Sequence, residues 1–364
     1  MIPAGHTSLQ PARPHPAAAP TDWRHAWRTA VRDPRELLAM LGLDALASTL
    51  SNTAAAPAFN GHFPLRVPRS FIARMRHGDP HDPLLRQVLP ILDEERVVPG
   101  FALDAVGDAH ARLGGGVIHK YNGRALLIAT GSCAVHCRYC FRRHYPYAED
   151  TAAAAGWGEA LALLRADTSI HEVILSGGDP LSLASHKLAE LTDALQALPH
   201  IRRLRLHTRL PVVLPERIDA SLLAWLRGLP WPLAMVIHAN HGNEFDVSVD
   251  AALAALREAG AAASGIVLLN QAVLLRGVND SVDALADLCE RGYAAGVLPY
   301  YLHQLDRVAG AAHFEVDDGR ALALHAGLAA RLPGYLVPKL VREVAGQPGK
   351  TPLMADGGII PTAE

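Results

Sequence analysis

The stretch Ala125-Leu-Leu-Ile-Ala129 is followed directly by a loop that contains Cys133-Ala-Val-His-Cys137-Arg-Tyr-Cys140. The apolar run has the length and composition of a buried strand. Three of the four cysteines lie within these eight residues, at positions i, i+4 and i+7. On a loop, three such thiolates can bind three irons of a cubane iron–sulfur cluster and leave the fourth iron open to a small molecule. A site that lacks one protein ligand is suited to chemistry, as open catalytic zinc sites are.

A zinc site is the alternative use of the same cysteines, and His136 or His144 could then supply the fourth ligand. In that case the chain would be a zinc-stabilised binding protein. The remaining thiol, Cys289, lies far away in a stretch of helical periodicity. Few cysteines, most of them clustered, are typical of a reducing compartment rather than of a disulfide framework.

The composition indicates an enzyme-sized cytoplasmic chain. It has 364 residues, half of them apolar, and a formal net charge of −2. Such a charge balance gives no sign of a nucleic-acid or membrane partner. No run of eighteen apolar residues is present, and the N-terminus lacks the charged-then-apolar order of a signal peptide.

Outward from the cysteine loop, patterns of buried strands alternate with patterns of helices. Strands are predicted at 125–129, 172–175, 203–207, 233–238, 265–269 and 297–302. Helices are predicted at 157–164, 187–198, 220–226, 249–259 and 282–293. This alternation predicts an α/β fold with a parallel sheet, a partial (β/α)6 TIM-like barrel. The cysteine loop follows the first strand, so it lies at the end of the barrel that carries active sites.

Four regions are expected along the chain. Residues 1–22 are rich in Pro and Ala and are expected to form a flexible tail. Residues 23–112 are predicted to form a helical N-terminal region, and residues 113–330 the partial barrel. Residues 331–364 would form a C-terminal segment.

The cysteine motif after the first strand of a six-unit array resembles the radical SAM superfamily. Ser176-Gly177-Gly178-Asp179-Pro180, at the end of the second strand, is similar to the superfamily's glycine-rich contact to S-adenosylmethionine. Glycine lets a backbone approach a ligand closely, and strand-end carbonyls or Asp179 could accept from the ammonium of that ligand. The resemblance implies a 4Fe–4S cluster on Cys133, Cys137 and Cys140, whose open iron is chelated by S-adenosylmethionine. One-electron reduction then generates a radical that abstracts hydrogen.

Further motifs narrow the resemblance to the lysine 2,3-aminomutase family, over roughly residues 60–355. They are Cys140-Phe-Arg142-Arg143, His238-Ala-Asn240-His241, Asn270-Gln271 with Gly277-Val-Asn279-Asp280, Pro299-Tyr300-Tyr301 and Gly349-Lys350-Thr351-Pro352, in this order.

This resemblance implies a second coenzyme, pyridoxal 5′-phosphate, bound to Lys350 as a Schiff base. Lys120, Tyr121 and Arg124 match the family's phosphate-binding positions. Lysine at position 120 keeps the charge of an arginine but lacks its bidentate fork. His303 stands where long members have a tyrosine near the coenzyme.

The resemblance also implies a place for each end of the substrate. Arg142 matches the arginine that binds the substrate carboxylate, a task suited to a planar guanidinium. Asp306 and Glu343 match the two acids that meet the side-chain ammonium of lysine, although the family has aspartate at the second position. His238 and Gln271 match positions near S-adenosylmethionine.

The sequence ends fourteen residues after Lys350, without the C-terminal extension of the long catabolic enzymes. Together with the Gln-Leu-Asp306 loop, this resembles the short branch called elongation factor P β-lysylation proteins. The branch implies conversion of L-α-lysine to (R)-β-lysine, which a separate ligase attaches to elongation factor P. A reductant such as flavodoxin or ferredoxin would supply the electron. A free amino acid 2,3-aminomutase acting on lysine or glutamate shares every cofactor motif, although a glutamate enzyme should not need two acids at the side-chain end.

Overall fold

The computed structural model describes residues 22–46, 63–148, 150–153 and 156–354. Apart from Asp22, the tail predicted over residues 1–22 lies outside the described residues. No helix in these ranges is long and apolar enough to cross a membrane.

The described residues form a ten-stranded sheet whose strands follow one another in sequence order. Strands β3 to β9 are parallel, whereas β1, β2 and β10 run antiparallel to their neighbours. The bounds are β1 Arg112–Gly114, β2 Val117–Tyr121, β3 Arg124–Thr130, β4 Glu172–Gly177, β5 Arg203–Thr208, β6 Leu233–Ile237, β7 Ile266–Val273, β8 Leu298–His303, β9 Lys339–Arg342 and β10 Thr351–Pro352. Strands β1 and β10 lie at the two ends of this order and do not pair with each other, so the barrel is open.

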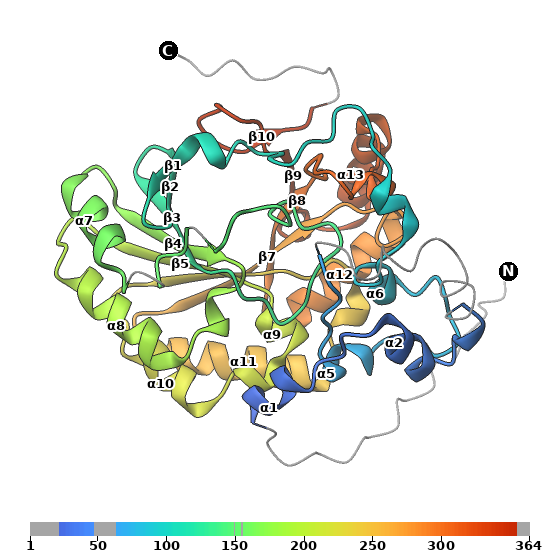
Figure 1. Ribbon diagram of the computed structural model, residues 1–364, viewed down its shortest axis with the longest axis horizontal. Helices are drawn as coiled ribbons and strands as arrows, with labels where there is room; N and C mark the ends of the chain where they lie inside the picture. Colours follow the sequence, from blue (N-terminus) through green and yellow to red (C-terminus); the bar gives the residue numbers. More distant parts are fainter. Residues whose placement is uncertain (1–21, 47–62, 149, 154–155, 355–364) are drawn as a thin grey trace, which may run out of the picture.

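A helix follows each of the strands β3 to β8 and returns along the outside of the sheet, as Figure 1 shows for α8, α10 and α11. The helices are α1 Trp23–Arg28, α2 Pro34–Met40, α5 Arg69–Ile72, α6 Pro83–Arg86, α7 Gly158–Ala166, α8 Ser185–Gln196, α9 Leu210–Val213, α10 Ala220–Arg227, α11 Val247–Ala261, α12 Val282–Ala294 and α13 Asp318–Arg331. The predicted partial (β/α)6 barrel is confirmed.

Local sequence explains these elements. All but the last residue of β4 are buried, as expected for a parallel strand covered on both faces. In β5, Leu204 and Leu206 pack into the hydrophobic core. His207, the next residue, points to the other face and lines the barrel interior. The helices α10 and α11 begin where Asp219 and Asp246 accept hydrogen bonds from backbone N–H groups of the first turn.

The sequence patterns missed α13 and the strands at the edges of the sheet. Strands β9 and β10 have four and two residues, too short for an apolar run to stand out. The β1–β2 hairpin turns at Gly114, Gly115 and Gly116, all with positive φ. The predicted boundary at residue 112 therefore falls inside β1, and residues beyond 331 add β9 and β10 to the sheet.

The N-terminal region consists of short helices that pack against the loops after β5 and β6. Arg74 donates to the carbonyl oxygens of Val212, at 2.7 Å, and of Glu244. Ser70 donates to the carbonyl oxygen of Val213 at 3.3 Å. These contacts place the region beside the carboxyl ends of the strands, where active sites of barrels lie.

Candidate active site

A cavity of about 660 Å³ occupies the barrel interior and the carboxyl ends of its strands. The residues that the sequence predicts to bind the cluster, the two coenzymes and the substrate all line this cavity. They are Lys120, Tyr121, Arg124, Cys133, Cys137, Cys140, Arg142, Gly177, Gly178, Asp179, His238, Gln271, Asp306, Glu343 and Lys350. The fold therefore brings residues from distant parts of the chain into one site.

The three clustered cysteines line this cavity from the loop that follows β3. Burial raises the pKa of Cys140 to about 11, and the neighbouring Cys137 adds to the shift. Burial likewise raises the pKa of Cys133, with further contributions from Cys140 and Asp179. Both thiols therefore keep their protons in the absence of a metal, and metal binding would displace those protons.

Their arrangement does not match a single-ion site. Among the described residues, no three His, Cys, Asp or Glu side chains converge as ligands of one metal ion do. His136 donates from Nδ1 to the carbonyl oxygen of Pro64 at 2.7 Å, and His144 donates from Nε2 to that of Ala309 at 3.1 Å. In a cubane cluster each thiolate binds its own iron, so the three sulfurs need not share one centre.

The glycines after β4 serve a purpose that the sequence did not reveal. A Cβ at Gly177 would lie 2.6 Å from the carbonyl oxygen of Thr130, and one at Gly178 would lie 2.4 Å from that of Ser132. These glycines let the β4 loop pack directly on the start of the cysteine loop.

The carboxylate of Asp179 is occupied by protein donors. It accepts from the Thr208 hydroxyl at 2.7 Å and from the backbone N–H groups of Arg209 and Leu181 at 2.7 and 3.0 Å. The sequence predicts that Asp179 or strand-end carbonyls accept from a ligand ammonium. In the structure the carboxylate of Asp179 instead fixes the loop, and the contact by the carbonyls stays a prediction.

Lys350 and Glu343 form an ion pair inside the cavity. The Tyr121 hydroxyl donates to Oε1 of Glu343 at 2.5 Å, and Nζ of Lys120 lies 3.7 Å from the same atom. Burial and the hydrogen bond to Glu343 raise the pKa of Tyr121, so its hydroxyl remains a donor. The predicted coenzyme lysine and the predicted second substrate acid are therefore direct neighbours.

Arg142 is buried and held from two sides. Its Nε donates to Oδ2 of Asp108 at 2.7 Å, and one Nη donates to the Ser176 hydroxyl at 3.1 Å. Lys120 pairs with the other oxygen of Asp108 at 2.5 Å. Burial alone would raise the pKa of Asp108. The charges of Arg142 and Lys120 outweigh burial and hold this pKa below its usual value. The other Nη of Arg142 has no hydrogen-bond partner among the described residues and can serve a ligand.

Asp306 lines the same cavity without a partner for Oδ1 among the described residues. Burial raises the pKa of this carboxyl to about 7, although the Lys350 ammonium opposes the shift. A buried carboxylate without a partner is costly, so Asp306 offers a place for a cation that the protein itself does not supply.

The remaining predicted residues lie around these groups. His238 follows β6 and its Nε2 is 2.8 Å from the Tyr139 hydroxyl, whereas no hydrogen bond of the Gln271 side chain on β7 is found among the described residues. Arg124 stacks over the ring of Tyr121, 4.5 Å from its centroid. His303 is buried, and burial together with the Lys350 charge lowers its pKa to about 3, so it is neutral.

Sequence reasoning missed Asp108, His207 and Arg209, all of which line the cavity. Nε2 of His207 is buried without a partner among the described residues. His207 and Arg209 stand at the carboxyl end of β5, and polar residues at such a strand end are a signal that could have found them. Asp108 precedes the first predicted strand in an irregular stretch, where no comparable signal exists.

Comparisons with known proteins identify relatives of the whole chain. No protein-family model matches the chain. L-lysine 2,3-aminomutase of Escherichia coli (strain K12) is 48% identical over 332 residues, which are 91% of this chain and 94% of that protein. The enzyme of the same name from Haemophilus influenzae is 42% identical over 330 residues, 91% of this chain and 95% of that protein. That of Clostridium subterminale is 32% identical over 285 residues, 78% and 67% of the two chains.

Among solved structures, a radical SAM methyltransferase from Sphaerobacter thermophilus aligns over 64% of this chain and 72% of its own. Its TM-score of 0.41 and identity of 17% are too low to support a conclusion. The relatives named above are decisive, because they match this chain over nearly its whole length. The chain belongs to the L-lysine 2,3-aminomutase family.

Proposed function

We propose that this chain is an isomerase that moves the amino group of L-lysine from the α-carbon to the β-carbon and forms (R)-β-lysine. The observation that carries this proposal is the Asp306 carboxyl, whose Oδ1 has no partner among the described residues and which shares a cavity with Glu343 and Arg142. One cavity thus offers a cationic contact for a carboxylate and anionic contacts for a distant ammonium. The names of the relatives from three organisms support lysine as the substrate.

The residues present fit the cofactors of this reaction. Cys133, Cys137 and Cys140 would hold a 4Fe–4S cluster, and the carbonyls around Gly177 and Gly178, with His238 and Gln271, would surround S-adenosylmethionine. Lys350 would bind pyridoxal 5′-phosphate covalently, and Lys120, Tyr121 and Arg124 would meet its phosphate. When bound, the cluster and S-adenosylmethionine supply hydrogen-atom abstraction, and pyridoxal phosphate supplies a π-system for the migrating amino group.

The protein's own contribution is to hold both ends of lysine. One Nη of Arg142 makes no hydrogen bond with the described residues and would meet the carboxylate, while Asp108 and Ser176 fix the plane of the guanidinium. Glu343 pairs with the Lys350 ammonium in this structure. The carboxylates of Glu343 and Asp306 would accept from the side-chain ammonium of the substrate, which would take the place that the Lys350 ammonium has beside Glu343.

Glutamate as substrate fits the cavity less well. Its side-chain carboxylate would face Asp306 and Glu343, and like charges in a buried site repel strongly.

Anaerobic reconstitution tests the proposal. We would supply iron, sulfide, pyridoxal phosphate, S-adenosylmethionine and a reductant, then measure products from L-lysine and from L-glutamate. We expect β-lysine and no β-glutamate. Absence of β-lysine from protein shown to carry cluster and coenzyme would contradict the substrate, and zinc in place of iron would contradict the enzyme class.

Replacing Asp306 by asparagine should lower kcat/KM for lysine about 100-fold, because a charged hydrogen bond to the substrate ammonium is lost.

The same change should stabilise the protein without added cofactors. The folded-state pKa of about 7 lies above the ordinary 3.8, so the wild type loses stability as pH rises from about 4 through 7. The variant lacks this loss of stability, so at pH 8 we expect a gain on the order of 4 kcal/mol.

Thermal unfolding at pH 5 and pH 8 measures this difference. Asp108→Asn is the matched control: its carboxylate is stabilised by Arg142 and Lys120, so its loss should destabilise the protein at pH 8. An effect of Asp306→Asn that is the same at both pH values would show that the carboxyl does not titrate in this range.

Replacing Arg142 by lysine should raise the KM for lysine by roughly 10- to 100-fold, because the charge stays but the planar fork is lost. Steady-state kinetics with L-lysine checks this. Arg143→Lys is the control, because Arg143 donates to Glu94 at 2.6 Å and that ion pair can survive. Equal KM values for the two variants would argue against Arg142 as the carboxylate contact.

We further propose that the product serves to modify elongation factor P in the cytoplasm, with flavodoxin or ferredoxin as electron donor. Support comes from the resemblance of the loop at Asp306 and of residues 341–350 to the short branch of the family. The mass of elongation factor P, incubated with this enzyme, its ligase and L-lysine, should rise by one lysyl residue. An unchanged mass in the presence of β-lysine would contradict this destination.

A further inference from the structure

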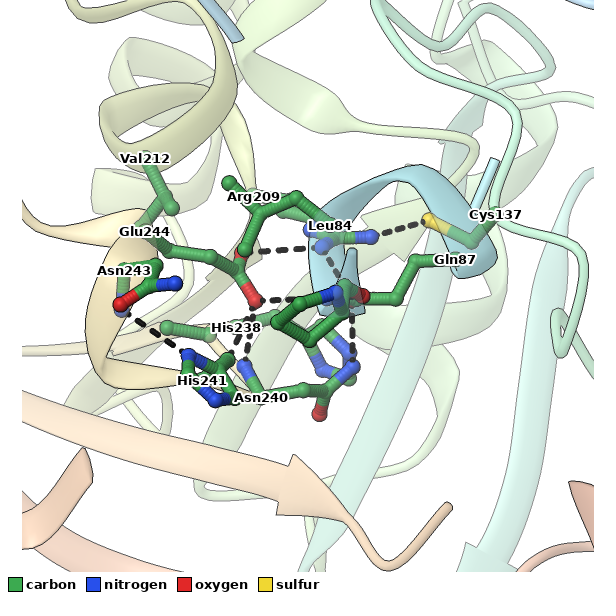
Figure 2. A network of polar contacts seen from close by, with 12 residues as sticks. Leu84, Gln87, Cys137, Arg209, Val212, His238, Asn240, His241, Asn243 and Glu244 are labelled. Atoms are coloured by element: carbon green, nitrogen blue, oxygen red, sulfur yellow. Dashed lines mark hydrogen bonds and ion pairs between the residues drawn. The ribbon is translucent and has the colours of Figure 1, made fainter. Parts of the chain in front are cut away.

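Arg209 lies directly after β5, and four side chains from three parts of the chain surround its guanidinium (Figure 2). One Nη donates to Sγ of Cys137 at 2.8 Å and to the Tyr139 hydroxyl at 2.7 Å. The other Nη donates to Oε1 of Gln87 at 2.7 Å and to Oε2 of Glu244 at 2.9 Å. The Arg209 side chain is 7% exposed and that of Glu244 is fully buried.

The partner of this arginine is itself held in place. Oε1 of Glu244 accepts from the backbone N–H groups of Asn240 and His241 at 2.8 and 3.2 Å, and from Nε2 of Gln87 at 3.1 Å. Both carboxylate oxygens are thus engaged, and Figure 2 shows Glu244 and Cys137 on opposite sides of the Arg209 guanidinium. Both Nη atoms of Arg209 are engaged as well, while its Nε is buried without a partner among the described residues. Contacts on both Nη atoms fix the orientation of the guanidinium, and with it the N–H group aimed at Cys137.

Of the three clustered sulfurs, Cys137 is the one that a charged side chain among the described residues reaches by hydrogen bond. We propose that Arg209 is a positioning residue that raises the reduction potential of the cluster through its N–H···S bond to Cys137. This inference rests on the proposed function, since it needs a cluster on these cysteines.

The direction of the effect follows from electrostatics. The cluster accepts one electron from a low-potential reductant, and no bond to Arg209 forms or breaks. The added negative charge spreads onto the thiolate sulfurs, where a positive N–H donor stabilises it. Hydrogen bonds to the sulfurs and the net charge around the site are known determinants of cluster potential. Glu244 partly offsets the effect, because it is negative and lies farther from the sulfur.

An EPR-monitored potentiometric titration of the reconstituted full chain, without lysine, tests the inference. Arg209→Gln should lower the equilibrium constant for reduction about tenfold, which is ~59 mV for one electron. Glu244→Gln should shift the potential in the opposite direction, because it removes the offsetting charge. A purely structural role would not produce shifts of opposite sign.

The variant Arg209→Gln leaves the buried charge of Glu244 unpaired and can therefore fail to hold a cluster. The double variant Arg209→Gln with Glu244→Gln removes both charges of the pair, so it provides the test in that case. Its potential should be lower than that of Glu244→Gln alone. Equal potentials in these two proteins, or in wild type and Arg209→Gln, would overturn the role of Arg209. A wild type that binds no iron and sulfide would instead overturn the proposed function, so the two failures are distinguishable.

Discussion

Replacing Cys140 by alanine should reduce β-lysine formation by at least roughly three orders of magnitude, because the cluster loses one of three protein ligands. Two of the four irons would then lack a protein thiolate, and a cluster so held is expected to decay. Iron and acid-labile sulfide, measured after anaerobic reconstitution, should fall well below four each per chain. The product should fall in parallel.

Cys289→Ala is the matched control for this experiment. Cys289 is buried on α12 and does not line the large cavity. Its loss should cost about 1 kcal/mol of stability and leave cluster and activity intact. If Cys140→Ala kept its full iron content and activity, the cysteine motif could not be the cluster site.

Replacing Lys350 by alanine should abolish covalent attachment of pyridoxal phosphate while the cluster remains. Activity should fall by roughly three orders of magnitude or more, because the covalent partner of the coenzyme is lost. Borohydride treatment followed by peptide mass mapping measures the attachment directly. In the wild type the modified peptide should contain Lys350, and in the variant no modified peptide should be found.

Lys339→Ala is the control, since Lys339 is exposed at the start of β9, close in sequence to the site but outside the cavity. It should retain both coenzyme and activity. A modified peptide from Lys350→Ala that contained Lys120 would move the attachment to the other lysine of the cavity. Iron content equal to that of the wild type would show that the loss is specific to the coenzyme.

Sequence alone predicted the barrel well where its strands are long and buried on both faces. Runs such as 172–175 and 233–238 stand out because interior parallel strands contact hydrophobic layers on both sides. Strand β9 has four residues and pairs with β8 on one side and with the two-residue edge strand β10 on the other, so its sequence carries no such run. The same holds for the β1–β2 hairpin, whose course depends on glycines with positive φ.

The reactive groups of the site can be identified from the sequence. The spacing of Cys133, Cys137 and Cys140 and the motif at Lys350 indicated thiolate and amine chemistry, because both signals are local in the chain. Their meeting in one cavity follows from strand order, since the carboxyl ends of parallel strands share one end of a barrel.

The contacts that hold each side chain of the site in place can be seen only in the folded protein. Asp108 braces Arg142 across 34 positions, and Gln87 joins Glu244 across 157. No local pattern encodes such pairs, because a hydrogen bond depends on the positions of two distant backbones. The structure also distinguished Asp179, whose oxygens are occupied by protein donors, from Asp306, which lacks such a donor at Oδ1 among the described residues. In sequence both are simply aspartates, and burial and partners give them different roles.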